Sequence, residues 1–335
     1  MKYIMPPMAE FEDEFWNQLS HEFTDKRIYD RTHSIDLPYD QVDISPIPEY
    51  KQINDSFSDV SQSVAEDIWN NSDDPLYVLW SGGIDSTNIV TSLLKIGAFF
   101  TIVYSDTSIE ENPYFYKNIV RKAPRFKFKD FYLMLSELSE KPVTLISGEF
   151  GDYCTREVGI ANKKGWVEGT GFIWDVDDGI PDSRKEFLQP VLDACPFDLE
   201  SNADEFWWLF WTMKWQLNAT RYHCIARKRI NNLIHFYEHP LIQLWSMNNP
   251  VATCHDSIHK FQIKESIREY YRTDDVFEWT KQESTPKNLF GHKGKRLFDV
   301  HKHLAKTGRP NHGSPYGAWI DEDWNMGGFG RWHNE

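Results

Sequence analysis

The chain has 335 residues, of which 40% are apolar and 26% are charged, so it can bury a core in one large domain or two. Its formal net charge of −15 argues against a protein that binds nucleic acid, because neutralising phosphates requires a basic surface. It has no apolar run of about 18 residues and no signal-peptide core at its start, which predicts a cytoplasmic protein and no membrane partner. Its four cysteines form no C-x-x-C pair and are therefore expected to be reduced thiols.

Residues 1–55 are expected to precede the main domain as a helix and an extended arm. Apolar residues at helical spacing predict a short amphipathic helix over residues 8–24. Several prolines between residues 29 and 50 prevent a regular helix there, so this passage is predicted to lie extended on the main domain.

The main domain is placed at residues 56–290. Strands and helices alternate through its first half, which predicts a parallel sheet with helices on both faces. We expect strands at residues 76–80, 99–104 and 142–146, and helices at residues 57–70, 88–96, 113–122, 130–137, 184–194 and 204–229. The sequence thus predicts an α/β fold of Rossmann-like type followed by a helical C-terminal part. Residues 291–335, rich in Gly, Pro, His and Trp, are predicted to form a tail or lid.

A strand that turns through two glycines directly into a helix is predicted around residues 81–87, whose sequence is S-G-G-I-D-S-T. Such a turn points several backbone N–H groups at one spot near the positive end of the helix dipole, which favours a bound phosphate. The glycines let the backbone approach the anion, and the hydroxyl groups add donors. No lysine follows the glycines, which excludes the loop of the P-loop nucleotide hydrolases.

One carboxylate follows each of the first two predicted strands. Asp85 lies inside the phosphate loop, where it would repel phosphates unless a cation bridged them, so the loop implies Mg²⁺. Asp106 follows the next strand and is expected near the nucleotide, because ligands of open α/β sheets bind at the carboxyl ends of the strands.

The third predicted strand ends in a second informative segment, S-G-E-F-G-D-Y at residues 147–153. Its two carboxylates, Glu149 and Asp152, lie beside glycines at the same edge of the predicted sheet. This arrangement fits a metal and acid/base role.

Both segments resemble a known family. The first resembles the S-G-G-x-D-S-[ST] pyrophosphate loop of the N-type ATP pyrophosphatases, and the second resembles S-G-E-G-x-D-E of the asparagine synthetase C-terminal domain. Here Phe150 replaces a Gly, Gly151 replaces a Ser or Ala, and Tyr153 replaces a Glu. Residues 236–247 and 264–269 resemble two further segments of that domain more loosely. The resemblance implies the adenine nucleotide alpha-hydrolase fold, with ATP and Mg²⁺ as cofactors.

The resemblance also implies an activity. Members of this group form the acyl-adenylate of a carboxylate, release pyrophosphate, and let ammonia or an amine displace AMP. The residues implied to bind ATP and its pyrophosphate are Ser81, Gly82, Gly83, Asp85, Ser86, Thr87, Asp106 and Gly148. Asp85 and Asp152 would hold Mg²⁺, and Glu149 would assist deprotonation of the amine. Lys281 would neutralise the departing pyrophosphate.

The nitrogen source and two alternatives stay open. Residues 1–55 leave no room for a glutaminase domain, so the chain is expected to use free ammonia, an amine, or ammonia from a separate protein, with a small-molecule or peptide carboxylate. Residues 104–112 resemble a segment of the phosphoadenylyl-sulfate reductases, which need a C-terminal Cys, yet no Cys follows Cys254. A non-catalytic nucleotide-binding protein would account for Tyr153 and for the missing Gly-Phe after Lys281.

Overall fold

The computed structural model of the chain describes residues 30–36, 45–129, 134, 138, 141–154, 178–214, 232–249 and 260–271. The predicted helix at residues 8–24, Lys281 and the tail at residues 291–335 lie outside these described residues, as does most of the predicted helix at residues 130–137.

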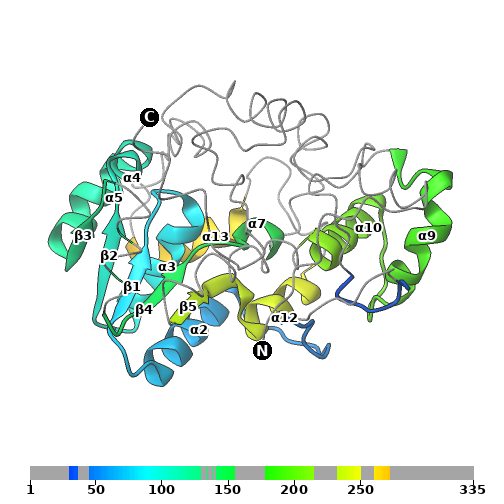
Figure 1. The fold of residues 1–335 in the computed structure, drawn as a ribbon, viewed down its shortest axis with the longest axis horizontal. Coiled ribbons are helices and arrows are strands. Elements are labelled where there is room, and N and C mark those ends of the chain that lie inside the picture. The colour runs from blue at the N-terminus through cyan, green and yellow to red at the C-terminus, as the bar shows by residue number, and fades with distance from the viewer. Residues whose placement is uncertain are drawn as a thin grey trace, which may run out of the picture.

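Five parallel strands form one sheet in the described part of the chain, in the order β3-β2-β1-β4-β5 (Figure 1). They are β1 (Leu76–Leu79), β2 (Phe100–Tyr104), β3 (Arg125–Lys127), β4 (Thr144–Ser147) and β5 (Asn232–His235). The register places Val78 between Ile102 and Ile146. The order runs outward from β1 to β3 on one side and from β4 to β5 on the other, so it reverses between β1 and β4. The predicted α/β fold with a parallel sheet is confirmed.

Two of these strands were not predicted from the sequence. The edge strand β3 has three residues, two of them exposed and basic, and this is too short for an alternating pattern to be measured. The strand β5, Asn-Leu-Ile-His, has four residues of which only two are apolar, and its pairing with β4 defines it better than its own composition does.

Three helices pack against one another on one face of the sheet: α2 (Phe57–Asn71), α3 (Ile84–Lys95) and α13 (Phe261–Tyr271). The first of them begins at Ser56, whose hydroxyl accepts a hydrogen bond from the Asp59 N–H at 3.1 Å. Its buried residues Val60, Val64 and Ile68 recur every four positions and form its apolar stripe.

The opposite face of the sheet is also covered. Val103 of β2 and Leu145 of β4 pack there with Met134 and Leu138, both of which have helical backbone. Because apolar side chains are buried on both faces, the strands need almost continuous apolar sequence, as β1 shows with Leu-Tyr-Val-Leu.

Further helices lie beyond the β4–β5 side of the sheet (Figure 1). These are α7 (Gly151–Cys154), α9 (Asp182–Asp193), α10 (Asn202–Leu209) and α12 (Pro240–Asn248), with a π-helix at Phe210–Lys214 and a 3₁₀ turn at Phe236–Glu238. On the β2–β3 side lie α4 (Asp106–Glu111), α5 (Pro113–Asn118) and a 3₁₀ turn at Val120–Lys122. The described part of the segment predicted as a helix at residues 204–229 is deeply buried, because Trp207, Trp208 and Trp211 are each at most 1% exposed. No helix in the described ranges is both long and apolar enough to span a bilayer.

Residues 30–36 and 45–56 contain no helix or strand and are held by a buried arginine. The Arg31 guanidinium lies 4.6 Å from the Trp211 ring centre and donates hydrogen bonds to the carbonyls of Ser45, at 2.9 Å, and Trp211, at 3.1 Å. These contacts attach this part of the chain to the helices beyond β5.

Candidate functional site

The strand order reverses between β1 and β4, and in open parallel sheets ligands bind at the carboxyl ends of the strands beside such a reversal. The two segments that carry the predicted chemistry follow these two strands. We call residues 80–86, which run from the end of β1 into the first turn of α3, the first loop. Residues 148–152, which run from the end of β4 into α7, are the second loop. The topology therefore brings both predicted segments to one edge of the sheet.

Side-chain hydroxyl groups close the first loop. The Ser81 N–H donates to the Ser86 hydroxyl at 3.1 Å, and the Ser86 hydroxyl donates to the Gly83 carbonyl at 3.2 Å. The Ser81 and Ser86 hydroxyls lie 3.0 Å apart, and the Gly83 N–H donates to the Ser81 hydroxyl at 3.2 Å. These hydrogen bonds preform the loop. Because Ser81 is exposed, the loop is also accessible to a ligand.

One glycine of the first loop, Gly82, is required by its surroundings. Gly82 has a φ of +93°, and a Cβ there would lie 2.6 Å from the Ser108 carbonyl oxygen and 2.8 Å from Glu111 Cβ. Glu111, on α4, is 4% exposed, and its Oε1 would lie 3.4 Å from a Cβ on Gly83. Glu111 thus places a third carboxylate beside the loop, which sequence reasoning missed.

Thr87 lies apart from the other predicted hydroxyl groups. It is fully buried, its hydroxyl accepts a hydrogen bond from the Trp80 indole N–H at 3.0 Å, and its own N–H donates to the Gly83 carbonyl. The Trp80 ring in turn packs on Phe115 of α5 at 5.5 Å. The hydroxyl of Thr87 therefore holds the start of α3 to the core, whereas those of Ser81 and Ser86 lie in the loop.

The second loop packs directly on the first. A Cβ on Gly148 would lie 3.0 Å from the Ser86 backbone nitrogen, and a Cβ on Gly151 would overlap the Asp85 carboxyl group. Glu149 is exposed, and Phe150, buried beneath it, has a φ of +73°. A left-handed backbone at a residue with a large side chain is strained, and such residues concentrate at functional sites.

A buried pair, Ser147 and His235, supports the second loop. These residues face each other at the ends of β4 and β5, and the Ser147 hydroxyl lies 2.6 Å from His235 Nδ1. The same hydroxyl accepts a hydrogen bond from the Glu149 N–H at 3.4 Å, and the Phe150 ring packs edge-on against His235 at 5.2 Å. Sequence reasoning missed His235 because it did not predict β5.

Asp85 and Asp152 converge on one cation. The ammonium of Lys260 lies 2.6 Å from Asp152 Oδ1 and also pairs with Asp85 Oδ2. The Lys260 side chain is 7% exposed, whereas those of Asp85 and Asp152 are 20% and 44% exposed, so the cluster is buried on the lysine side and opens toward Asp152. The two predicted metal ligands therefore lie close together, and Lys260 joins them without having been predicted.

The charges of this cluster affect the neighbouring titratable groups. Burial alone would lower the pKa of Lys260, but the charges of Asp152 and Asp85 outweigh it and raise the pKa above its usual value. Burial, reinforced by the charge of Asp85, raises the pKa of both Tyr237 and Cys154 well above their usual values. Lys260 is therefore charged, while Tyr237 and Cys154 are neutral. The Tyr237 hydroxyl donates to the Asp85 carbonyl at 3.0 Å and so fixes the start of α3.

The donor set fits Mg²⁺. Asp85 and Asp152 offer carboxylate oxygens at one point, and the ammonium between them shows that a cation is accommodated there. Among the residues with described positions, no group of three or more His, Cys, Asp or Glu side chains could hold a metal. Mg²⁺ is commonly bound by one or two carboxylates, with water and phosphate oxygens as its other ligands. The site therefore suits a Mg²⁺ that binds together with a phosphate compound.

Asp106 lies at the edge of this arrangement. It begins α4, its side chain is 63% exposed, and it pairs with Lys127 of β3 at 2.5 Å. Its carboxylate therefore takes part in a surface ion pair and does not join Lys260, Asp85 and Asp152.

No protein-family model matches this chain, and no curated protein sequence matches it significantly.

Proposed function

We propose that this chain is an ATP-dependent ligase that adenylates a carboxylate, releases pyrophosphate and transfers the acyl group to ammonia or an amine. The observation that supports this most is the convergence of Asp85 and Asp152, from two different loops, on a single cation beside a glycine-rich loop at a helix start. A carboxylate is a poor electrophile, and making AMP its leaving group requires charge stabilisation around the phosphates. We also propose that the sheet is of the adenine nucleotide alpha-hydrolase type.

In this proposal the first loop binds the β and γ phosphates of ATP. Gly82, at positive φ, supplies the turn, the exposed hydroxyl of Ser81, which accepts from the Gly83 N–H, would donate to the anion, and the start of α3 adds its dipole. Asp85 and Asp152 hold Mg²⁺, which stabilises the negative charge of the phosphates when bound. Gly148 contributes by packing on Ser86 and so keeping the two loops together.

Glu149 is the residue suited to take a proton from the attacking amine. It is exposed at the sheet edge, three positions before Asp152, and its backbone N–H is fixed by the Ser147 hydroxyl. We propose that Lys281, predicted to neutralise the departing pyrophosphate, acts from outside the described residues.

The test is product analysis. The purified chain, incubated with ATP, Mg²⁺, ammonia and a panel of carboxylates, is expected to yield AMP and pyrophosphate in equal amounts, measured by chromatography and a coupled pyrophosphate assay. Thiol-dependent sulfite release from phosphoadenylyl sulfate would support the reductase instead, and nucleotide binding without either product would support a non-catalytic protein.

A matched pair of variants links the activity to the site. Asp85→Asn should lower AMP formation by at least about a hundredfold, because it removes a charge that holds the metal at the phosphates. The control is Asp67→Asn, which removes a carboxylate of the same type from an ion pair with His239 at 3.1 Å, on α2 and outside the two loops. It should retain normal activity. Near-normal AMP formation by Asp85→Asn, with circular dichroism showing an intact fold, would contradict the proposal.

A further inference from the structure

Lys260 combines two features that are seldom found together in a lysine. Its ammonium is buried between two carboxylates, and its backbone has a φ of +56°, in the left-handed region. Among the described non-glycine residues, positive φ occurs at Lys260, Phe150 and His33, so two of the three lie at the site. A strained backbone persists where surrounding contacts enforce it. At Lys260 the strained backbone accompanies an ammonium held between Asp85 and Asp152.

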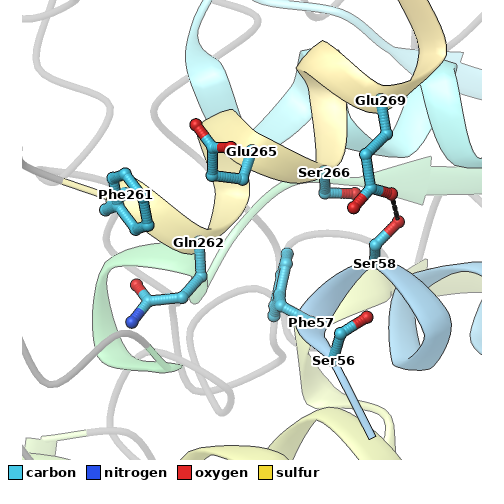
Figure 2. Close-up of a pocket in the computed structure, with 8 residues that line it drawn as sticks. All are labelled: Ser56, Phe57, Ser58, Phe261, Gln262, Glu265, Ser266 and Glu269. Carbon is cyan, nitrogen blue, oxygen red and sulfur yellow. Dashed lines mark hydrogen bonds between the residues drawn. The ribbon is translucent and has the colours of Figure 1, made fainter. Parts of the chain in front are cut away.

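The helix that follows Lys260 is firmly attached. Figure 2 shows Glu269 of α13 facing Ser58 of α2, whose hydroxyl donates to it. The ammonium of Lys95, on α3, donates to the Ser266 carbonyl at 2.9 Å and pairs with Glu269 at 3.3 Å. Because α13 is fixed to both α2 and α3, the backbone of Lys260 is fixed as well. The part of Lys260 that can move is its four-carbon side chain.

We propose that Lys260 is an internal competitor for the divalent metal, which occupies the position between Asp85 and Asp152 until a nucleotide arrives and then moves its ammonium to the phosphates. This inference rests on the proposed function in one respect, namely that these two carboxylates are the metal ligands.

Charge balance explains why such a residue is useful. Two carboxylates held at one point repel each other unless a cation lies between them. The ammonium supplies that cation when no metal is bound, so the two loops keep their arrangement. A divalent metal and the phosphates of a nucleotide together offer the carboxylates a stronger cation and offer the ammonium a new anionic partner. Metal binding and nucleotide binding therefore become coupled through the position of one side chain.

The size of the coupling follows from how often the ammonium occupies the site. If the carboxylates are available in about 1–10% of nucleotide-free molecules, the apparent metal affinity is lowered about 10- to 100-fold. A neutral side chain at position 260 removes this competition. We therefore expect Lys260→Met to bind a metal alone about 10- to 100-fold more tightly than the unaltered chain does.

The experiment measures Mn²⁺ binding by electron paramagnetic resonance, with and without α,β-methylene-ATP, which cannot be cleaved between its α and β phosphates. Without nucleotide, Lys260→Met should bind Mn²⁺ more tightly than the unaltered chain. With the analogue, its advantage should disappear or reverse, because Lys260 then contacts phosphates. The matched control is Lys127→Met, which removes another lysine paired with a carboxylate, at the surface and away from α13, and should leave Mn²⁺ affinity without nucleotide unchanged.

The outcomes separate this inference from the proposed function. If Lys260→Met and the unaltered chain bind Mn²⁺ equally tightly without nucleotide, the competitor role is overturned. The metal site itself would still be supported if Mn²⁺ binding in the presence of the analogue is lost in Asp85→Asn. If Lys260→Met still binds Mn²⁺ more tightly than the unaltered chain by the same factor with the analogue, the effect is simple charge repulsion, and the competitor role is also overturned. Absence of Mn²⁺ binding in every variant, with and without the analogue, would overturn both.

Folding is monitored in parallel. Lys260→Met leaves two carboxylates facing each other, so its thermal unfolding midpoint should be low without metal and should rise with Mn²⁺ by more than that of the unaltered chain. Lys260→Gln, whose neutral amide can still donate to one carboxylate, serves if the Met variant does not fold. If the unfolding midpoint of the Lys260 variant does not change when Mn²⁺ is added, this would count against the competitor role.

Discussion

The first loop and the second loop each deliver one carboxylate to Lys260, but they are built differently. The first loop reaches its conformation with Gly82 at positive φ and with hydrogen bonds among its own serines. The second loop places a phenylalanine at positive φ and depends on Ser147 and His235 beneath it. The first conformation is encoded locally, whereas the second is imposed by the strands and side chains around it.

The second loop shows how packing can hold a large side chain at a position of positive φ. Phe150 stands where the resembled family has Gly, and its left-handed backbone costs about 1–2 kcal/mol relative to an unstrained residue. Its ring is 3% exposed and packs against His235 and Tyr153, which offsets that cost. The backbone geometry that a glycine would provide is thus kept by packing.

The largest effect is expected at Phe150, where the packing that imposes the second conformation can be removed. Phe150→Ala should lower the free energy of unfolding by about 3–5 kcal/mol, because a buried ring is removed. Phe150→Gly should be at least as stable as Phe150→Ala, by up to about 1 kcal/mol, since Gly adopts positive φ without strain. Denaturant unfolding measures both.

The control for Phe150 is a buried phenylalanine in a helix. Phe115 of α5 is 2% exposed and its backbone is helical, so Phe115→Gly should be less stable than Phe115→Ala by about 1 kcal/mol. The order of Gly and Ala should therefore reverse between the two positions. The same order at both would show that Phe150 is not strained in solution.

The dependence of the first loop on its glycine is tested at Gly82. Gly82→Ala should lower the free energy of unfolding by about 2–4 kcal/mol, since it adds both backbone strain and overlap with the Ser108 carbonyl. Gly97, after α3, has a φ of +72°, but a Cβ added there would meet no atom within 4 Å, so Gly97→Ala should show the strain alone, about 1–2 kcal/mol. If chemical denaturation shows that Gly82→Ala and Gly97→Ala lower the free energy of unfolding equally, then α4 does not pack closely against the loop.

The same contrast explains how much of the molecule could be predicted from its sequence. The strands that become β1, β2 and β4, and the helices that become α2, α3 and α9, carry apolar patterns long enough to identify them, and the structure has them within a few residues of the predicted bounds. The first loop was predicted as a strand-to-helix turn because its glycines and serines determine its conformation locally. The strands β3 and β5 were missed because they carry few apolar residues of their own and are defined by pairing with their neighbours.

The site was predicted in part for the same reason. Asp85 and Asp152 each follow a predictable strand, so their meeting at one edge of the sheet could be expected. Lys260 could not, since it lies 108 positions after Asp152 and reaches the site through the docking of α13. Glu111 likewise reaches the first loop through the packing of α4, which was not predicted as a helix. Long-range contacts of this kind leave no local signal in one sequence.

The support beneath the second loop gives the smallest expected effect and bears directly on how the two loops differ. Ser147→Ala removes a buried hydrogen bond to His235 and the acceptor of the Glu149 N–H, which should lower the free energy of unfolding by about 1–3 kcal/mol. Combined with His235→Phe, which keeps a ring against Phe150, the two changes should couple by at least about 0.5–1 kcal/mol in a double-mutant cycle. Additive losses would mean that Ser147 and His235 act independently.

Because the first loop holds itself together, nucleotide affinity should fall less in Ser147→Ala than in Gly82→Ala, and the opposite order would show that the first loop also depends on the second for its shape.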